Sequence, residues 1–267
     1  MKYIRYILFV ICLIIFLFSG YQLLGIYFEY KEGIDVYNEA SNNVYLEKDK
    51  NVTLIPTIVE NEKSSKNLDK KNKEIISLDV DWSKFNETVI GWIKIENNEI
   101  INYPIIQSKD NEYYLHHLYD GTYNSSGSIF VDYRNDGFDN RHVIIYGHNM
   151  KDGTMFNSIK QYQNQEYANK HRYIYIATPN GKTRVFYVYS CHLTDALGYS
   201  DGFSAYQVCF DGEEWNDWIN KSVKRSLITS DIEIPEKGNI ITLSTCMSRG
   251  IDTERCVIHA IEIENIV

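Results

Sequence analysis

The sequence has no excess of basic residues. Its 27 Lys and Arg residues are outnumbered by 36 Asp and Glu residues, which gives a formal net charge of -9 at pH 7. Proteins that bind nucleic acid neutralise the phosphate backbone with clustered Lys and Arg side chains. The acidic balance therefore argues against a nucleic-acid partner.

Metal-binding spacings are missing as well. The sequence has no Cys-x-x-Cys and no His-x-x-x-His pair, and Cys191 and His192 are neighbours that would point to opposite faces of a strand. We therefore predict no metal site and no cofactor. Four cysteines follow the N-terminal region, an even number that would allow two disulfides, although no spacing specifically supports them: Cys191, Cys209, Cys246 and Cys256.

One long uncharged run is present, at the N-terminus. From Tyr6 to Phe28 no residue is charged, and a helix of that length crosses a hydrocarbon core about 30 Å thick. Lys2 and Arg5 precede the run, so the positive-inside rule places the N-terminus in the cytoplasm and the rest of the chain outside. A cleaved signal peptide is the main alternative, but no small-x-small cleavage site is evident. We therefore predict an uncleaved, single-pass signal anchor in the cell membrane over residues 1–30.

Composition divides the remaining chain in two. Residues 31–78 are dominated by Asn, Lys, Glu, Asp and Ser, and such a segment buries too little apolar surface to offset its ordering entropy. We interpret it as a polar spacer. Residues 79–267 have the length of one domain and carry many short strand patterns with few helices, which predicts a mostly-β fold. Periodicity alone does not separate a closed barrel from a sandwich.

An amphipathic helix is predicted over residues 213–227, between two of the strand patterns. Acidic residues open it and basic residues close it, as the helix dipole favours. Its apolar side chains share one side at helical spacing and are predicted to pack on the core: Trp215, Trp218, Ile219 and, as further members, Ser222 and Val223.

The strand pattern over residues 239–246 ends in a cysteine. A polar stretch follows Cys246, and a second β-branched run begins after Arg255, so two strands joined by a short loop are predicted to hold these residues at the two ends of that loop. Nearby positive charge favours the thiolate, which is the nucleophilic form of cysteine. Cys246 is therefore the candidate nucleophile, with a buried structural cysteine as the alternative. Cys256 alternates to the opposite strand face from Arg255 and is predicted to pack in the core.

His148 is the candidate partner of this thiol. It follows the strand pattern over residues 142–146 and Gly147, which permits a tight approach, so its ring is presented at the head of a loop. The layout matches that at Cys246. Nucleophile, imidazole and a cation that cannot act as a base form a consistent set for acyl transfer, in which Arg255 stabilises the oxyanion.

These residues resemble the signature of the sortases, the membrane-anchored cysteine transpeptidases of Gram-positive bacteria. The resemblance covers most of residues 79–267, and the N-terminal anchor, the helix before the cysteine strand and the segment 102–107 are similar to class B members. The matching motifs are Thr242-Leu243-Ser244-Thr245-Cys246, Arg255, Tyr146-Gly147-His148-Asn149-Met150 and Asn102-Tyr103-Pro104-Ile105-Ile106-Gln107.

The resemblance implies an eight-stranded sortase β-barrel with short helices and a two-step reaction. Cys246 would attack a threonine carbonyl in a C-terminal sorting motif of the Asn-Pro-x-Thr type on a surface protein, and the acyl group would pass to an amine of a lipid-linked cell-wall precursor. His148 would act as general acid and base, and Arg255 would bind the oxyanion. The resemblance further implies that four residues line the substrate groove: Asn102, Tyr146, Ser244 and Thr245.

Several alternatives stay open at this stage. Arg249 is a cationic alternative to Arg255, which we prefer because a strand holds it in place. Asp252 is a possible orienting carboxylate for His148. The same residues would also serve a cysteine peptidase with water as acceptor or a pilin-polymerising sortase. An inactive, anchored β-barrel that recruits a partner through exposed aromatic residues is the non-enzymatic alternative.

Overall fold

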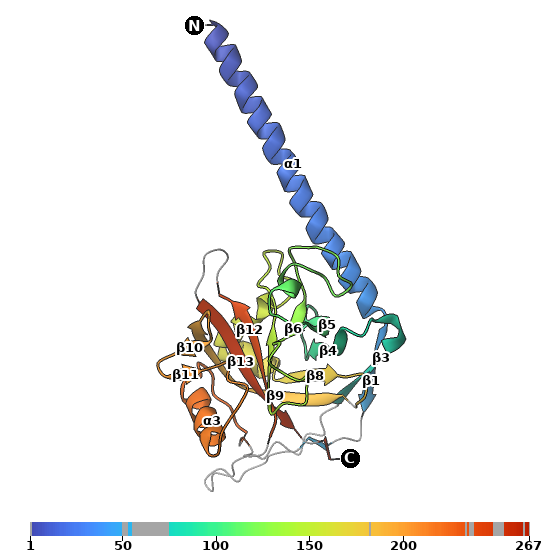
Figure 1. Ribbon diagram of the computed structural model, residues 1–267, viewed down its shortest axis with the longest axis vertical. Helices are drawn as coiled ribbons and strands as arrows, with labels where there is room; N and C mark the ends of the chain where they lie inside the picture. The colour runs from blue at the N-terminus through green and yellow to red at the C-terminus, as the bar shows by residue number, and fades with distance from the viewer. Residues whose placement is uncertain are drawn as a thin grey trace.

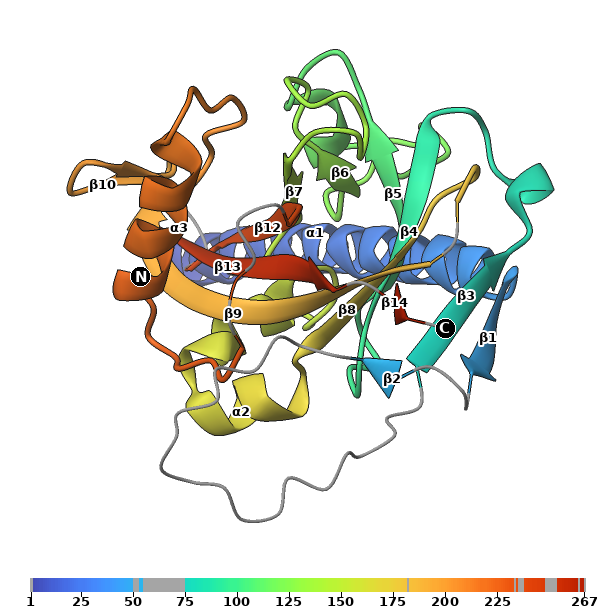
Figure 2. The ribbon, with the colours of Figure 1, turned by 90° about the horizontal axis from the view of Figure 1, so that it is seen from below.

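A closed barrel of eight strands forms the centre of the molecule (Figures 1 and 2), and its strand order is β12-β13-β9-β8-β4-β5-β6-β7. The computed structural model describes residues 2–49, 53–54, 75–181, 183–232, 234, 238–247, 254–263 and 265–266. The barrel strands are β4 (Val89–Ile95), β5 (Asn102–Gln107), β6 (Ile129–Val131), β7 (His142–Tyr146), β8 (Tyr173–Ala177), β9 (Arg184–Asp195), β12 (Ile240–Cys246) and β13 (Glu254–Ile263). The predicted mostly-β barrel with short helices is thus confirmed.

The remaining elements lie around the barrel. Short strands form three two-stranded sheets, β1 with β3, β10 with β11, and β14 with β2. Their bounds are β1 (Val44–Asp49), β2 (Thr53–Leu54), β3 (Ile75–Val80), β10 (Tyr199–Ser200), β11 (Phe203–Ser204) and β14 (Asn265–Ile266). The helices are α1 (Lys2–Ser41), α2 (Gln165–Lys170) and α3 (Glu214–Lys224), with 3-10 turns η1 (Trp82–Lys84), η2 (Tyr113–Leu115) and η3 (Asn157–Gln163).

The barrel strands are apolar on both faces. In β12, Leu243 packs in the interior cluster, whereas Ile240 belongs to a second cluster outside the wall. In β7, Ile145 faces inward and Ile144 outward in the same way. Strands covered on both faces read as nearly continuous apolar runs, which is why alternation is weak in the β12 sequence.

Helix α3 covers the outer face of one barrel wall (Figure 2). Four of the predicted stripe residues are buried, namely Trp215, Trp218, Ile219 and Ser222. Including Val223 in that stripe was wrong, because its side chain is 47% exposed. It follows Ser222 by one position and so points to a neighbouring sector of the helix.

Helix α1 is one continuous helix from Lys2 to Ser41, long and apolar enough to cross a membrane. It continues beyond residue 30 into the segment that the sequence indicates as a spacer, and there it packs on the barrel. Tyr37 is buried, donates a hydrogen bond to the Gly127 carbonyl at 2.6 Å, and contacts the Tyr103 ring edge-on at 5.1 Å. Much of the segment between β1 and β3 lies outside the described residues.

Candidate active site

The ends of two parallel strands create an open edge of the barrel. β7 and β12 are parallel neighbours, with Tyr146 beside Ser244, and the Gly147 amide donates to the Ser244 carbonyl at 3.2 Å. Cys246 is the last residue of β12, and His148 is the second residue after β7. Because parallel strands end at the same edge, the structure brings the thiol and the imidazole to one place.

Arg255 lies at the same edge. It is the direct cross-strand partner of Cys246 in the antiparallel pair of β12 and β13. Opposed residues in such a pair point to the same face, with Cβ atoms about 5 Å apart. Arg255 also contributes to lowering the pKa of His148, so all three predicted residues are within electrostatic reach of one another.

Gly147 shapes the turn that carries His148. A Cβ atom at this position would lie 2.5 Å from Ile129 Cδ1 and 2.7 Å from the ring of Phe156. Any side chain would therefore collide with the core, and the chain leaving β7 would move. The tight approach inferred from the sequence is confirmed at this glycine.

The His148 ring is half-buried and held by one hydrogen bond, from Nε2 to the Leu115 carbonyl at 2.8 Å. A carbonyl only accepts, so Nε2 carries the proton and the neutral ring keeps its lone pair on Nδ1. Burial lowers the pKa of His148, the Leu115 hydrogen bond opposes this, and the neighbouring His116 and Arg255 lower the pKa further. The ring is therefore neutral at pH 7 and able to accept a proton.

Asn149 ties the histidine loop to the end of the cysteine strand. Its Nδ2 donates to the Cys246 carbonyl at 2.9 Å and to the Met247 carbonyl at 3.2 Å. Its Oδ1 accepts from Asn157 at 2.7 Å and from Lys160 at 3.1 Å. Sequence reasoning missed this positioning residue, although its place directly after His148 was an available signal.

Two of the predicted groove residues lie together on the outer face. The Tyr146 ring meets Tyr206 edge-on at 5.4 Å, and the Tyr206 hydroxyl is 2.5 Å from Ser244 Oγ. Tyr206 also senses the charges of Cys246 and Arg255, and burial, the largest effect, raises its pKa to about 12. Tyr206 was missed in the sequence because it follows β11, far along the chain from both strands.

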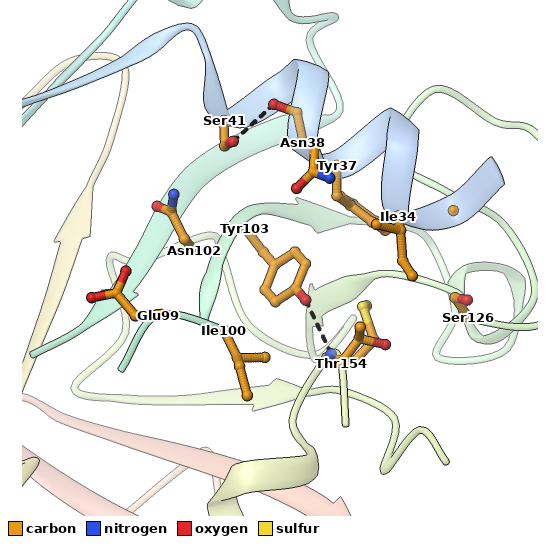
Figure 3. Close-up of a pocket in the computed structure, with 12 residues that line it drawn as sticks. Ile34, Tyr37, Asn38, Ser41, Glu99, Ile100, Asn102, Tyr103, Ser126 and Thr154 are labelled. Atoms are coloured by element: carbon orange, nitrogen blue, oxygen red, sulfur yellow. Dashed lines mark hydrogen bonds between the residues drawn. The ribbon is translucent and has the colours of Figure 1, made fainter. Parts of the chain in front are cut away.

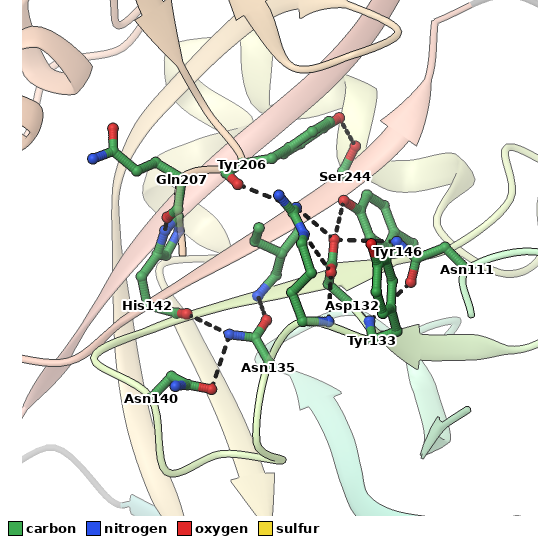
Figure 4. A network of polar contacts seen from close by, with 12 residues as sticks. Asn111, Asp132, Tyr133, Asn135, Asn140, His142, Tyr146, Tyr206, Gln207 and Ser244 are labelled. Atoms are coloured by element: carbon green, nitrogen blue, oxygen red, sulfur yellow. Dashed lines mark hydrogen bonds and ion pairs between the residues drawn. The ribbon is translucent and has the colours of Figure 1, made fainter. Parts of the chain in front are cut away.

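A buried acid fixes the Tyr146 side chain (Figure 4). Its hydroxyl donates to Asp132 at 2.8 Å, and Arg134 forms an ion pair with the same carboxylate at 2.8 Å. Burial alone would raise the pKa of Asp132, but the hydrogen bonds from Arg134 and Tyr146 outweigh it and lower the pKa. Arg134 also donates to the Tyr206 carbonyl at 3.2 Å, so one network holds both tyrosines.

The other two predicted groove residues lie elsewhere. Thr245 is buried and pairs in register with Cys256, whose side chain is in the interior cluster, so it faces away from Ser244 and Cys246. Asn102 accepts a hydrogen bond from the Trp92 indole at 2.8 Å and lines a cavity of about 210 Å³ between α1 and β5 (Figure 3).

The remaining cysteines and alternatives are quickly placed. Cys256 is buried, as predicted, with its sulfur 3.9 Å from that of Cys191. Neither is in a disulfide, and Cys209 and Cys246 are free as well. The alternatives Arg249 and Asp252 lie outside the described residues.

Comparison with known proteins gives consistent matches. A family model described as the sortase domain matches residues 93–263. The sortase B of Listeria monocytogenes is 34% identical over 244 residues, which cover 90% of this chain and 87% of that protein. The sortase B structure from Bacillus anthracis in complex with AAEK1 is similar with a TM-score of 0.66 and 30% identity, covering 90% of this chain and all (100%) of that one. Staphylococcus aureus sortase B, solved as a substrate complex and with triglycine, matches at a TM-score of 0.61 and 30% identity, covering 69% of this chain and 83% and 84% of those chains.

Proposed function

Because the chain belongs to the sortase family, within which it matches sortase B, and is therefore a cysteine transpeptidase, we propose that Cys246 is its nucleophile, His148 its general acid and base, and Arg255 its oxyanion-binding cation. One observation carries this assignment. Cys246 and Arg255 are opposed in register at the edge where β7 delivers His148. The three side-chain types supply all that acyl transfer from an amide requires.

The first step forms the acyl-enzyme. The Cys246 sulfur attacks the threonine carbonyl carbon of the sorting motif, and the Arg255 guanidinium donates hydrogen bonds to the oxyanion that forms. The carbon–nitrogen bond then breaks. His148, protonated in that state, gives its proton to the leaving amine, and a thioester remains on Cys246.

The second step returns the enzyme. A primary amine attacks the thioester carbonyl while the lone pair of neutral His148 takes up its proton. The sulfur leaves as thiolate, stabilised by Arg255. His148 is suited to this role because its lowered pKa keeps it neutral at pH 7, ready to accept. The products are the transferred protein with a new amide bond and free Cys246.

The substrate is a surface protein that carries a C-terminal sorting motif of the Asn-Pro-x-Thr type. Tyr146 and Ser244 line its groove on the outer face, together with Tyr206, which contacts both. Asn102 contacts substrate from the β5 side, and Thr245, whose side chain is turned inward, contributes its backbone. The substrate and triglycine complexes of the Staphylococcus aureus protein support a peptide donor and an amine acceptor of this kind.

The protein acts at the cell surface. α1 spans the cell membrane with its N-terminus in the cytoplasm, and the barrel lies outside, where it meets an amine of a lipid-linked cell-wall precursor. Support comes from the length and apolarity of α1 and from Lys2 and Arg5 ahead of the uncharged run. The division at residues 1–30, 31–78 and 79–267 stays a proposal for the boundaries of anchor, spacer and catalytic domain.

A peptide assay tests the activity. The full chain in detergent is incubated with an Asn-Pro-x-Thr peptide, with and without triglycine, and products are identified by mass spectrometry. We expect cleavage after threonine, a thioester on Cys246, and a ligated product that requires triglycine. Cys246→Ala and a peptide with the motif scrambled serve as controls. Hydrolysis as the sole outcome in the presence of triglycine would assign the protein to the water-accepting peptidases instead.

A further inference from the structure

The uncharged run of α1 ends where the barrel begins. Phe28 is its last residue, and Glu29 is bonded to the barrel at once. The Ser125 amide donates to the Glu29 carboxylate at 2.7 Å, and Asn124 Nδ2 donates to the Glu29 carbonyl at 2.8 Å. The segment that holds Asn124 and Ser125 therefore lies within one residue of the end of the apolar run.

The contact is continued by the next turns of α1, so the attitude of the barrel on the helix is fixed. A Cβ atom at Gly33 would lie 3.2 Å from polar atoms of Asn124 and Ser126, which shows how closely the helix approaches this segment. Tyr37 is then buried between the segment and β5. Because α1 is continuous through these residues, the barrel does not hang on a free tether.

The same segment exposes aromatic rings. Tyr113 is 44% and Tyr123 68% exposed. The His117 ring stacks on Tyr113 at 3.9 Å and meets Tyr123 edge-on at 5.6 Å. Single exposed tyrosines are ordinary on a water-facing surface, but these lie at the level of the bilayer edge, where tyrosine is enriched because its ring is apolar and its hydroxyl polar.

We propose that the loop of residues 113–125 rests in the headgroup layer of the membrane that α1 spans, with Tyr113 and Tyr123 as its lipid contacts. This inference rests on the membrane anchoring proposed above. The headgroup layer is several ångströms thick on each side of the hydrocarbon core, and Tyr123 is two residues from Ser125. Figure 1 shows the green loops of this region beside α1, at the end of the barrel that faces the N-terminal half of the helix.

The contact sets the position of the catalytic edge. His148 is hydrogen-bonded to Leu115 of the 113–125 loop, and its ring lies 6.4 Å from that of His116. The loop at the membrane and the catalytic base are thus in direct contact. The edge is held at the bilayer surface, which suits a peptide donor and an amine acceptor that both carry membrane-embedded tails.

Charge does not drive this contact. Residues 110–127 contain Asp110, Glu112 and Asp120 but no Lys or Arg. Basic clusters are what attract proteins to anionic lipid, so the contact depends on the rings and is expected to form on a zwitterionic bilayer as well.

Spin-label depth measurements test the inference on the full chain in phosphatidylcholine nanodiscs. Cys12→Ser, Cys209→Ser and Cys246→Ala remove the accessible thiols, and one new label site is added at a time. Collision with oxygen, relative to a nickel chelate, reports depth. We expect the ratio to be highest for Ile15→Cys, intermediate for Tyr123→Cys, and lowest for Val223→Cys, a matched exposed apolar position on α3.

The outcomes separate the two proposals. A water-like ratio at Tyr123→Cys, equal to that at Val223→Cys while Ile15→Cys is deep, overturns the loop contact and leaves the anchor standing. A water-like ratio at Ile15→Cys overturns both. The peptide assay on Cys246 is independent of either result, because it uses a water-soluble donor in detergent.

A functional consequence gives a second measurement. Tyr113→Ser with Tyr123→Ser is expected to leave the rate with soluble peptide unchanged and to lower the rate with a lipid-anchored peptide in the same nanodisc by about fivefold to tenfold, the factor expected from losing about 1.0–1.4 kcal/mol. Val223→Ser with Leu227→Ser is the matched control, also at exposed apolar positions. Equal rates of the two double variants on the anchored peptide would contradict the proposal.

Discussion

Two ends of the same strand pair hold very different imidazoles. At one end, His142 of β7 lies 2.6 Å from Thr242 of β12 and packs on Trp218 of α3 at 4.6 Å. At the other end, His148 and Cys246 lie at an edge that α3 does not cover, and His148 has one hydrogen bond. The strands and residue types are alike, so what covers each end of the pair decides whether an imidazole packs or reacts.

The thiols repeat the comparison. Cys246 lies on the outer face beside Arg255, whereas Cys256, next to Arg255 in sequence, points into the barrel. There it meets Cys191, and the pKa of Cys191 is raised by the contact with Cys256 and by burial. A buried thiol with a raised pKa is not a nucleophile at pH 7. One step along a strand therefore separates a reactive cysteine from an inert one.

The largest expected effect comes from exchanging the two kinds of thiol. Cys246→Ala is expected to lower transpeptidation about 10⁴-fold or more, since it removes the nucleophile, with the unfolding midpoint unchanged. Cys256→Ala is expected to keep the chemistry and to destabilise the fold by roughly 1–2 kcal/mol through the lost core volume. Peptide ligation rates and denaturation in detergent measure both. Comparable activity losses in the two variants would remove the distinction.

The next effect concerns the cation. Arg255→Gln is expected to lower kcat about 10²- to 10³-fold, the size of effect seen when an oxyanion donor is removed, with KM little changed. Arg249→Gln is the matched control and is expected to retain most activity. Steady-state kinetics with the sorting peptide decide between them, and the reverse order of losses would transfer the role to Arg249.

The buried imidazoles predict sensitivity to acid. Burial is the largest cause that lowers the pKa of His142 and of His192 to about 4, and the pKa of His259 falls further. In the unfolded chain these rings titrate near pH 6.5. Between pH 6.5 and 4 the unfolded chain binds protons that the folded chain does not, so stability falls as the pH drops through that window. Each ring contributes up to about 1.4 kcal/mol per pH unit.

Unfolding by urea between pH 7 and 4.5 measures this loss, which is expected to total a few kcal/mol. His192→Phe is the informative variant, because neither ring nitrogen of His192 has a partner in the described part of the chain. It is expected to flatten the slope by about one proton without loss of a hydrogen bond. An unchanged slope would show that the unfolding does not depend on His192.

The sequence predicted what depends on neighbours along the chain. Strand ends, the loop between Cys246 and Arg255, and the inward turn of Cys256 follow from alternation within one strand or one hairpin. Closure of the barrel depends on the parallel pairing of β7 with β12, and local periodicity is the same in a barrel and a sandwich. The contact of Tyr206 with Ser244 is similarly long-range.

The docked end of α1 had a signal that composition concealed. Gly33, Tyr37 and Ala40 are buried at helical spacing among polar residues. Composition averaged over residues 31–78 gives these three little weight, so the stripe reads as spacer. Asn102 and Thr245 show the opposite limit, since a motif places a residue on a strand but not the contacts of its side chain.

The smallest expected effect tests how the open end of the pair is tuned. His116 and Arg255 both lower the pKa of His148, after burial, which is the largest cause. Removing the imidazole with His116→Gln is expected to raise the pKa of His148 and shift the acid limb of kcat/KM to higher pH by a fraction of a pH unit. His117→Gln, one position along the same loop, is expected to leave the limb in place. If His116→Gln leaves the limb unmoved, its proximity to His148 has no electrostatic consequence, and burial alone sets the pKa at the catalytic edge, as it does beneath α3.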